Sequence, residues 1–293
     1  MSVRIDSPYG EDGEWFRGNL HTHTDASPDA AWSLETVVAV YADRGYDFVV
    51  VTDHDVATPV ETVDDVTLLP GIEVTANGTH VVCLGTDDVV SPHADRQRVL
   101  DEAAAAGGIG ILPHPNWGPD YAHYSQSALE ALDGYAGIEI YNGAGRDGRG
   151  RPAATDRWDR LLSAGRVVWG YAADDAHADD DVGAAWTVVQ APTATPMAIL
   201  DALRAGRCYA STGVAIEAIT VEAGTITVET ADAEAIQLVA DYSAIQQTVT
   251  GSTATFHLPA DLDMDASYVR IVCHGTGEQT AWTQPLFLDG RRG

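Results

Sequence analysis

The sequence predicts an α/β protein followed by an all-β segment, and two observations support this fold class. Between residues 16 and 206, short β-branched runs alternate with stretches whose apolar residues recur at helical spacing. This alternation predicts a mostly parallel sheet with helices outside it. After Arg207 the helical spacing disappears, and segments such as "TITVET" and "AIQLVAD" alternate apolar with polar residues. That change predicts a β-sandwich-like appendage over 213–293, after a first domain over 1–212.

The first elements follow directly from these patterns. "FRGNLHTHT" is a predicted strand with a polar end, and a helix is expected over 33–46, between Ser33 as N-cap and Gly45 as stop. "DFVVVTDHD" is the next predicted strand. The runs "VTLLPGIEVT" and "THVVCLGT" are expected to pair as a hairpin around Asn77-Gly78.

The remaining elements of the first domain continue the alternation. Strands are expected at "GIGILPH", "GIEIYN", "VVWGYAADDAH" and "AAWTVVQA". Helices are expected over 92–107, 125–134, 152–165 and 196–206.

The chain is strongly acidic. Its 44 Asp and Glu residues against 16 basic residues, all of them Arg, give a formal charge of −28. Such a surface repels nucleic acid and anionic lipid, so neither is expected as a partner. At ~1 M salt the Debye length is only ~3 Å, which screens the self-repulsion. The charge therefore favours a halophilic source with a salty cytoplasm.

The cysteines and the apolar runs bear on the compartment. Cys83, Cys208 and Cys273 are an odd, scattered set in apolar surroundings, which favours reduced, buried thiols. The first residues show no basic start followed by an apolar stretch, and no run approaches the ~20 apolar residues of a membrane span. We expect a cytoplasmic protein.

Histidines and acids gather at the predicted strand ends. In sheets of this kind active groups lie at the carboxyl ends of strands. His-X-His at 21 and 23 puts two imidazoles on one face, because side chains in a strand repeat every two residues. A single histidine is more often structural, but such a set predicts a divalent metal centre. The residues at strand ends or starts are His21, His23, His54, Glu73, His80, His114, Asp175 and His177.

Six motifs in order resemble the PHP (polymerase and histidinol phosphatase) superfamily: "LHTHT", "VVVTDHD", "PGIEVT", "THVVCLG", "LPHPNW" and "ADDAH". The resemblance covers about residues 15–210 and implies a distorted (β/α)7 TIM-like barrel with up to three metals at its mouth. "AGRCYASTG" and the tail "YVRIVCHGTGEQTAWTQPLFL" further resemble the carbaryl-hydrolase-like branch.

Carried over residue by residue, the resemblance implies three metal sites. The first takes His21, His23, Glu73 and Asp175, and the second takes Glu73, His80 and His114, with Glu73 bridging. The third takes His54, His177 and an acid from the "TDASPDA" loop, where Asp29 is preferred and Asp25 competes. Imidazole with carboxylate suits two or three Zn, Mn or Fe ions rather than Ca or Mg.

These ligands also imply catalytic roles. A metal-bound hydroxide would attack, Asp175 would orient it, and His177 or His54 would protonate the leaving oxygen. Four further residues are candidates for substrate contact: Asn116, Asn142, Arg146 and Arg149. The two arginines can clamp a phosphate, or else form salt bridges with the acidic surface.

The function expected first is a metal-dependent phosphoesterase acting on a small phosphomonoester or phosphodiester. An amide, ester or carbamate hydrolase is the alternative, since two metals also polarise a carbonyl. A non-catalytic metal-binding module is the third possibility. The sequence leaves the natural substrate, the metal and the oligomeric state open.

Overall fold

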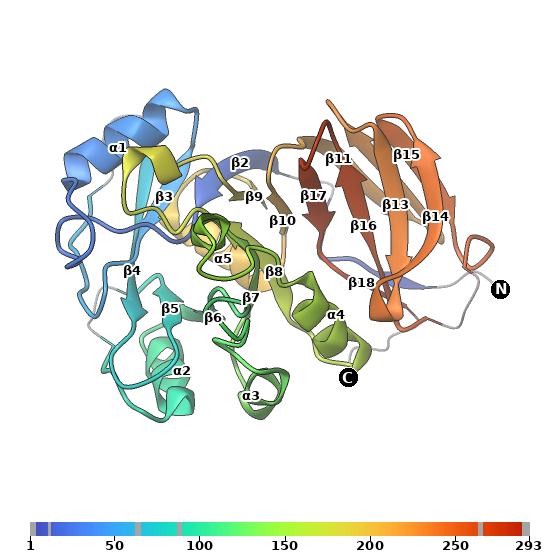
Figure 1. The fold of residues 1–293 in the computed structure, drawn as a ribbon. Coiled ribbons are helices and arrows are strands. Elements are labelled where there is room, and N and C mark those ends of the chain that lie inside the picture. The colour runs from blue at the N-terminus through green and yellow to red at the C-terminus, as the bar shows by residue number, and fades with distance from the viewer. Residues whose placement is uncertain (1–3, 11–12, 62–65, 87–89, 263–265, 289–293) are drawn as a thin grey trace.

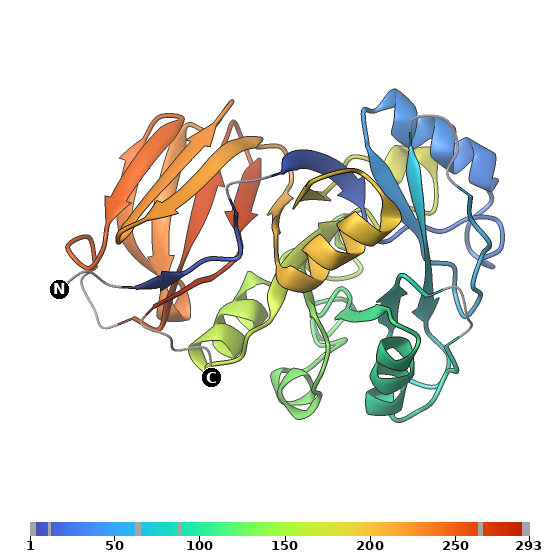
Figure 2. The ribbon, with the colours of Figure 1, turned by 180° about the vertical axis from the view of Figure 1, so that it is seen from behind.

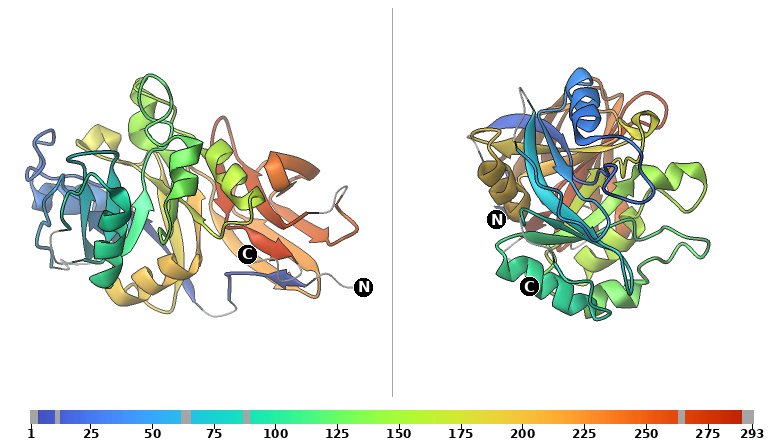
Figure 3. Two further views of the ribbon diagram at one scale, coloured as in Figure 1. Left: turned by 90° about the horizontal axis from the view of Figure 1, so that it is seen from below. Right: turned by 90° about the vertical axis from the view of Figure 1, so that its left-hand side faces the viewer.

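The computed structural model describes residues 4–10, 13–61, 66–86, 90–262 and 266–288. It has two lobes that lie end to end, an α/β lobe and an all-β lobe (Figures 1 and 3). This confirms the mixed α/β character, and the described residues after Arg207 form strands and one short 3-10 turn, as the loss of helical spacing predicts. In the described residues, the longest helices have ten residues and none is long and apolar enough to cross a membrane.

The α/β lobe is built on one curved sheet. Its strands are β2 (Glu14–Asn19), β3 (Phe48–Val51), β4 (Thr67–Val74), β5 (Val81–Leu84), β6 (Ile109–Leu112), β7 (Gly137–Asn142), β8 (Trp169–Ala173), β9 (Trp186–Ala191) and β10 (Cys208–Ser211). The pairs β2–β3, β3–β4, β6–β7 and β7–β8 are parallel. β5 runs antiparallel to β4 and to β6, so the expected hairpin around Asn77-Gly78 is present.

Helices cover the outside of this sheet (Figure 2). They are α1 (Leu34–Asp43), α2 (Arg96–Ala105), α3 (Gln126–Ala131), α4 (Thr155–Ser163) and α5 (Pro196–Ala205). Ser33 caps α1 as expected, because its side chain accepts from the Thr36 N–H. Short 3-10 turns η1 (Gly143–Asp147) and η2 (Asp179–Asp181) follow β7 and β8.

The expected (β/α)7 barrel is not confirmed, because the sheet is not closed by a ladder. β8 is the last strand of its path, and only an isolated bridge between Thr22 and Ala176 joins the ends of β2 and β8. At the open edge of β8, a side chain forms hydrogen bonds to the backbone instead. The Gln284 amide donates to Gly170 O at 2.7 Å and accepts from Gly170 N at 2.8 Å. A buried amide thus satisfies backbone groups that a neighbouring strand would otherwise pair.

Strands β9 and β10 belong to two cores at once. Val189 and Cys208 pack into the core of the α/β lobe, while Val188 and Tyr209 pack into that of the all-β lobe. Successive side chains in a strand point to opposite faces, so both faces of these strands are buried. This explains why the two strands are buried along most of their length and lack the regular alternation that marks a strand with one face in water.

The all-β lobe continues the same sheet through β17. Its strands are β1 (Ile5–Asp6), β11 (Ile216–Glu222), β12 (Thr225–Thr230), β13 (Ala235–Ala240), β14 (Ala244–Thr250), β15 (Thr253–His257), β16 (Tyr268–His274), β17 (Thr280–Thr283) and β18 (Leu286–Leu288). β11, β12 and β15 form a second sheet of three strands. β1 pairs with β18, so residues 4–10 pack with this lobe although the sequence grouped them with the first domain. The division at 212/213 stays a prediction.

A buried ion pair joins α4 to the all-β lobe beside the 3-10 turn η3 (Asp241–Ser243). Asp159 on α4 accepts two hydrogen bonds from the Arg270 guanidinium, at 2.9 and 2.7 Å. The Tyr268 hydroxyl donates to the same carboxylate at 3.0 Å, and Ser243 contacts it as well. The two charges are almost fully removed from water, so each depends on the other for compensation.

Candidate metal centre

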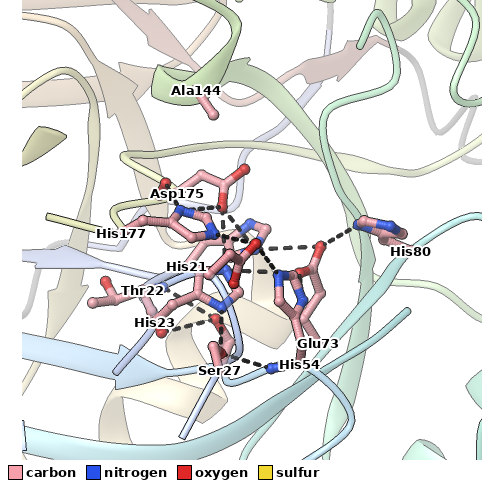
Figure 4. Close-up of polar contacts among 12 residues, drawn as sticks. His21, Thr22, His23, Ser27, His54, Glu73, His80, Ala144, Asp175 and His177 are labelled. Carbon is pink, nitrogen blue, oxygen red and sulfur yellow. Dashed lines mark hydrogen bonds and ion pairs between the residues drawn. The ribbon is translucent and has the colours of Figure 1, made fainter. Parts of the chain in front are cut away.

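The predicted ligands come together at one end of the sheet, where strands β2, β3, β4, β6 and β8 end (Figure 4). His21 and His23 follow β2, and Thr22 between them forms the bridge to Ala176. This bridge continues the extended backbone beyond β2. The two rings therefore lie on one side, with centroids 5.1 Å apart.

Glu73 stands at the centre of the cluster, 1% exposed, with imidazole nitrogens on both oxygens. Its Oε1 lies 2.8 Å from His80 Nδ1, 3.2 Å from His114 Nε2 and 3.4 Å from His21 Nε2. Its Oε2 lies 2.8 Å from His54 Nδ1 and 3.7 Å from His23 Nε2. A carboxylate whose two oxygens face different groups of imidazoles is placed to bridge two cations.

Asp175, which follows β8, lies close to His21 and His23. Its Oδ1 lies 3.3 Å from His21 Nε2 and 3.2 Å from His23 Nε2. The residue has a positive φ of 54°, as His114 has a φ of 32°. Backbone conformations of this kind are costly for residues other than glycine and concentrate at functional sites.

A third group lies towards the pocket opening. Asp29 Oδ2 is 3.2 Å from His54 Nε2 and 3.4 Å from His177 Nε2. Asp25 and Asp29 are both exposed, but the contacts described for these two rings are with Asp29 and not with Asp25. The structure thus brings Asp29, not Asp25, to the position that the resemblance implies for the third site.

His123 belongs to the cluster although it is not among the residues that the sequence predicts as ligands. Its ring centroid lies 4.7 Å from those of His80 and His114, and its Nε2 accepts a hydrogen bond from the His80 N–H at 2.9 Å. Burial, together with these two histidines, lowers the pKa of His123 to about 3. It lies in a loop after "HPNW", outside any strand end, so the strand-end rule gave no signal for it.

Beneath the ligands, Glu139 on β7 supports two of them. Its Oε1 accepts from His21 Nδ1 at 2.8 Å, and its Oε2 accepts from the His114 N–H at 2.8 Å and from Asn142 Nδ2 at 2.6 Å. A metal-binding histidine commonly donates its second nitrogen to a carboxylate, which fixes its tautomer and raises its basicity. The sequence showed Glu139 at a strand end but gave it no role. A carboxylate in the otherwise apolar "GIEI" was the available signal.

Two further buried carboxylates hold the loops that carry ligands. Asp53 accepts from the Thr24 N–H at 2.6 Å and from Ser27 Oγ at 2.8 Å, which ties the loop before Asp29 to β3. Asp174 Oδ1 accepts from three successive N–H groups, 183 to 185, at 2.7 to 3.0 Å. The hydrogen-bond partners of Asp53 are hydroxyl and backbone groups.

The protonation of the cluster follows from its burial and charge. Burial alone would lower the pKa of His21, but Asp175, Glu73 and Glu139 outweigh it and raise that pKa well above its ordinary value. Burial likewise opposes ionisation of Glu73, yet His21 and its neighbours hold the pKa of Glu73 well below its ordinary value. The buried Glu73 carboxylate therefore stays ionised and requires positive charge nearby.

The donor set fits divalent cations. His21 Nε2 and His54 Nδ1 are buried and form no hydrogen bond, although each lies close to Glu73. Both nitrogens therefore lie beside an anionic oxygen without a well-aligned hydrogen bond, and each is available as a ligand. Within the described residues, three groups have ligand atoms within 4.8 Å of one another: His21, His23 and Glu73; His23, His54 and His177; His80, His114 and His123. Imidazole with carboxylate is a set that Zn, Mn and Fe accept.

A pocket of about 650 Å³ opens above the cluster. Among the residues that line it are Arg146 and Arg149, whose predicted role as substrate contacts stays a prediction, and Trp117 and Ala144. Asn142 differs from the expectation. It is buried and donates to Asp175 Oδ2 at 3.2 Å as well as to Glu139, so it supports ligands rather than touching substrate.

Asn116 also differs from the expectation of a substrate contact. It is 5% exposed and is not part of the pocket lining. Its side-chain amide is bonded to the first turn of α4 and to the loop before it. The sequence could not distinguish a substrate contact from a bond to α4, because the direction of the Asn116 side chain depends on residues that are distant in the chain.

We expect Glu139→Gln to weaken metal binding by about 10- to 100-fold. Both carboxylate oxygens of Glu139 accept hydrogen bonds, Oε1 from His21 and Oε2 from the His114 N–H and the Asn142 amide. In glutamine one of these oxygens becomes an NH₂ group, so a buried donor would face another donor in either orientation. Competition dialysis against a chelator would measure the change. Glu102→Gln, on the surface beside His93, is the control, and equal affinities in the two variants would contradict a supporting role for Glu139.

Comparisons with known proteins agree with this geometry. A family model described as PHP-associated matches residues 170–208, which include Asp175 and His177. No curated protein matches the chain. Among solved structures, a two-domain protein of Bacteroides vulgatus containing a predicted PHP-like metal-dependent phosphoesterase matches with a TM-score of 0.56 at 16% identity. That match covers 98% of this chain and 90% of the other.

Endonuclease Q, solved with a 27-mer duplex bearing an abasic lesion at its active site, matches with a TM-score of 0.50 at 12% identity. That match covers 65% of this chain and 57% of the other. At such identities the likeness concerns the fold. The chain therefore shares its fold with these proteins, and residues 170–208 are similar to the PHP-associated family.

Proposed function

We propose that the protein is a metal-dependent phosphoesterase that hydrolyses a small phosphomonoester or phosphodiester. The observation that carries the proposal is the Glu73 carboxylate, which has nitrogens of five histidines within 3.7 Å. A purely structural core would not assemble five imidazoles around one buried acid beneath an open pocket. The PHP-like fold and the histidine–carboxylate groups support a metal-dependent hydrolase.

The residues divide into three roles. His21, His23 and Asp175 would hold the first ion, His80 and His114 the second, and Glu73 both. His54, His177 and Asp29 would hold a third. When bound, such ions supply Lewis acidity and make a nearby water easier to deprotonate at neutral pH.

The protein groups then position the reactants. Asp175 is fixed by Asn142 on one oxygen and by the two histidines on the other, so it can accept a hydrogen bond only from a defined direction. His54 and His177 are partly exposed and line the pocket, so in protein that holds no third ion either ring could give a proton to the leaving oxygen.

The arginines supply the anion-binding side of the proposal. Of the 16 arginines in a chain without lysine, Arg146 and Arg149 line the pocket. A guanidinium pairs with phosphate oxygens through parallel hydrogen bonds. In a protein of charge −28, local positive charge is needed to hold an anionic substrate.

Metal-loaded protein assayed against p-nitrophenyl phosphate and an aryl carbamate tests the proposal. We expect phosphate release that a chelator abolishes and that added Mn or Zn restores. Carbamate cleavage without phosphatase turnover would favour the amide, ester or carbamate alternative, which the carbaryl-hydrolase-like tail suggests. Tight metal binding without turnover of either ester would instead favour a non-catalytic metal-binding module.

A nucleic-acid substrate is not proposed. Endonuclease Q was solved with a duplex substrate, but the charge of −28 here would repel a polyanion along any extended contact surface. We propose a small-molecule substrate and a cytoplasmic setting.

We also propose that the acidic surface is an adaptation to concentrated salt. The free energy of unfolding is expected to rise steadily between about 0.1 M and ~2 M KCl, because screening removes the mutual repulsion of carboxylates. Urea denaturation at a series of KCl concentrations measures this, with sucrose as a non-ionic control. A free energy of unfolding that is independent of KCl would contradict the halophilic interpretation.

A further inference from the structure

Asn116 connects its own loop, next to the pocket-lining Trp117, to the loop at Arg151 and to the start of α4. Its Nδ2 donates to Ala153 O and to Asp156 Oδ1, both at 2.9 Å, and its Oδ1 accepts from Arg157 Nε at 3.1 Å. The amide therefore uses both ends to hold the start of α4. With all of these bonds made and the side chain buried, it has no free group for substrate.

The backbone on either side of Asn116 pairs with the arginine loop. Asn116 O accepts from the Arg151 N–H at 3.0 Å, and the Gly118 N–H donates to Arg149 O at 2.7 Å. Between them an antiparallel bridge pairs Trp117 with the facing residue of the loop. This short ribbon presents Trp117 and Arg149 to the pocket from neighbouring strands.

The facing residue is Gly150, and the ribbon requires a glycine there. A Cβ at this position would lie 2.7 Å from Trp117 Cα and 2.9 Å from Asn116 O. Both are backbone atoms, so they cannot move aside without separating the two segments. Gly150 thus offers a second way to disturb the ribbon without removing the amide of Asn116.

We propose that Asn116 is a positioning residue that fixes Trp117 and Arg149 on the substrate-facing wall. The inference rests on the proposed function only in taking this wall as the side that binds the substrate anion. None of the side-chain partners of Asn116 is a candidate metal ligand. Its loss therefore affects substrate binding more than metal content. A displacement of about 1 Å in a positioning group already changes rates up to 100-fold.

Kinetics of the metal-loaded Asn116→Ala and Gly150→Ala variants test the proposal. We expect KM for p-nitrophenyl phosphate to rise about tenfold, with kcat within about threefold and the metal content unchanged. Calorimetric titration with inorganic phosphate should show a parallel weakening of binding. The effect of combining Asn116→Ala with Arg149→Ala should be smaller than the sum of the two single effects, because Asn116 acts partly through Arg149.

The matched control is Gln97→Ala. Gln97 also bridges two segments through its amide, to Asp101 and Asp133, but away from the pocket. The proposal is overturned if KM and phosphate affinity of both folded variants equal those of the control, if metal is lost in parallel, or if the double variant is additive. Wild-type protein that binds phosphate but hydrolyses no ester overturns the proposed function alone. Failure of the wild type to bind phosphate overturns both.

Discussion

Replacing Glu73 by glutamine is expected to reduce kcat/KM by more than about 100-fold and to release bound metal. Loss of a group that merely supports a ligand costs about 10- to 100-fold, and Glu73 contacts two groups of ligands directly. Glutamine keeps the size but not the charge, so two closely spaced cations would no longer be compensated. Metal analysis of the purified variant and steady-state kinetics with p-nitrophenyl phosphate measure both effects.

Two further variants make this result specific. Glu102→Gln removes a surface carboxylate beside His93 and should leave activity unchanged. His21→Ala should lose activity as Glu73→Gln does, because its Nε2 faces both Glu73 and Asp175. A Glu73→Gln protein that keeps its full metal content and its rate would contradict a bridging carboxylate.

Replacing Arg270 by alanine is expected to lower the free energy of unfolding by about 3–5 kcal/mol. Arg270 and Asp159 are both nearly inaccessible to water, and alanine would leave the carboxylate buried with only two hydroxyl donors. Because Asp159 lies on α4 and Arg270 on β16, the cost measures how strongly the two lobes stabilise each other. Urea denaturation at fixed high salt concentration is the measurement.

The exposed pair of Arg204 and Asp201 provides the control. Arg204→Ala should cost less than about 1 kcal/mol, because an exposed pair is screened and its charges remain hydrated. Adding Asp159→Asn to Arg270→Ala should recover part of the loss, since the unpaired buried charge is removed. Equal free energies of unfolding for Arg270→Ala and Arg204→Ala would contradict the buried pair as a link between the lobes.

Local pattern predicted most of the helices and strands because each depends on residues close together in the chain. α1 and α5 lie within their predicted ranges, since periodicity and the capping Ser33 are local. The strand-end rule selected the histidines and acids that converge on Glu73, because parallel strands end at the same edge of a sheet. The rule gave no role to Glu139 and could not select His123, which reaches the cluster from a loop.

The sequence by itself determined the chemistry: which residues can bind cations, that they follow strands, and that the surface is strongly acidic. Only the tertiary structure decided where amides and loops point. It bonded the amides of Asn116 and Asn142 to other protein groups, placed Asp29 beside His54, and left β8 as an open edge whose Gly170 backbone pairs with Gln284. The physical reason is distance along the chain. Ligand type is a property of one residue, whereas a hydrogen bond between residues 170 and 284 exists only after the two lobes have packed.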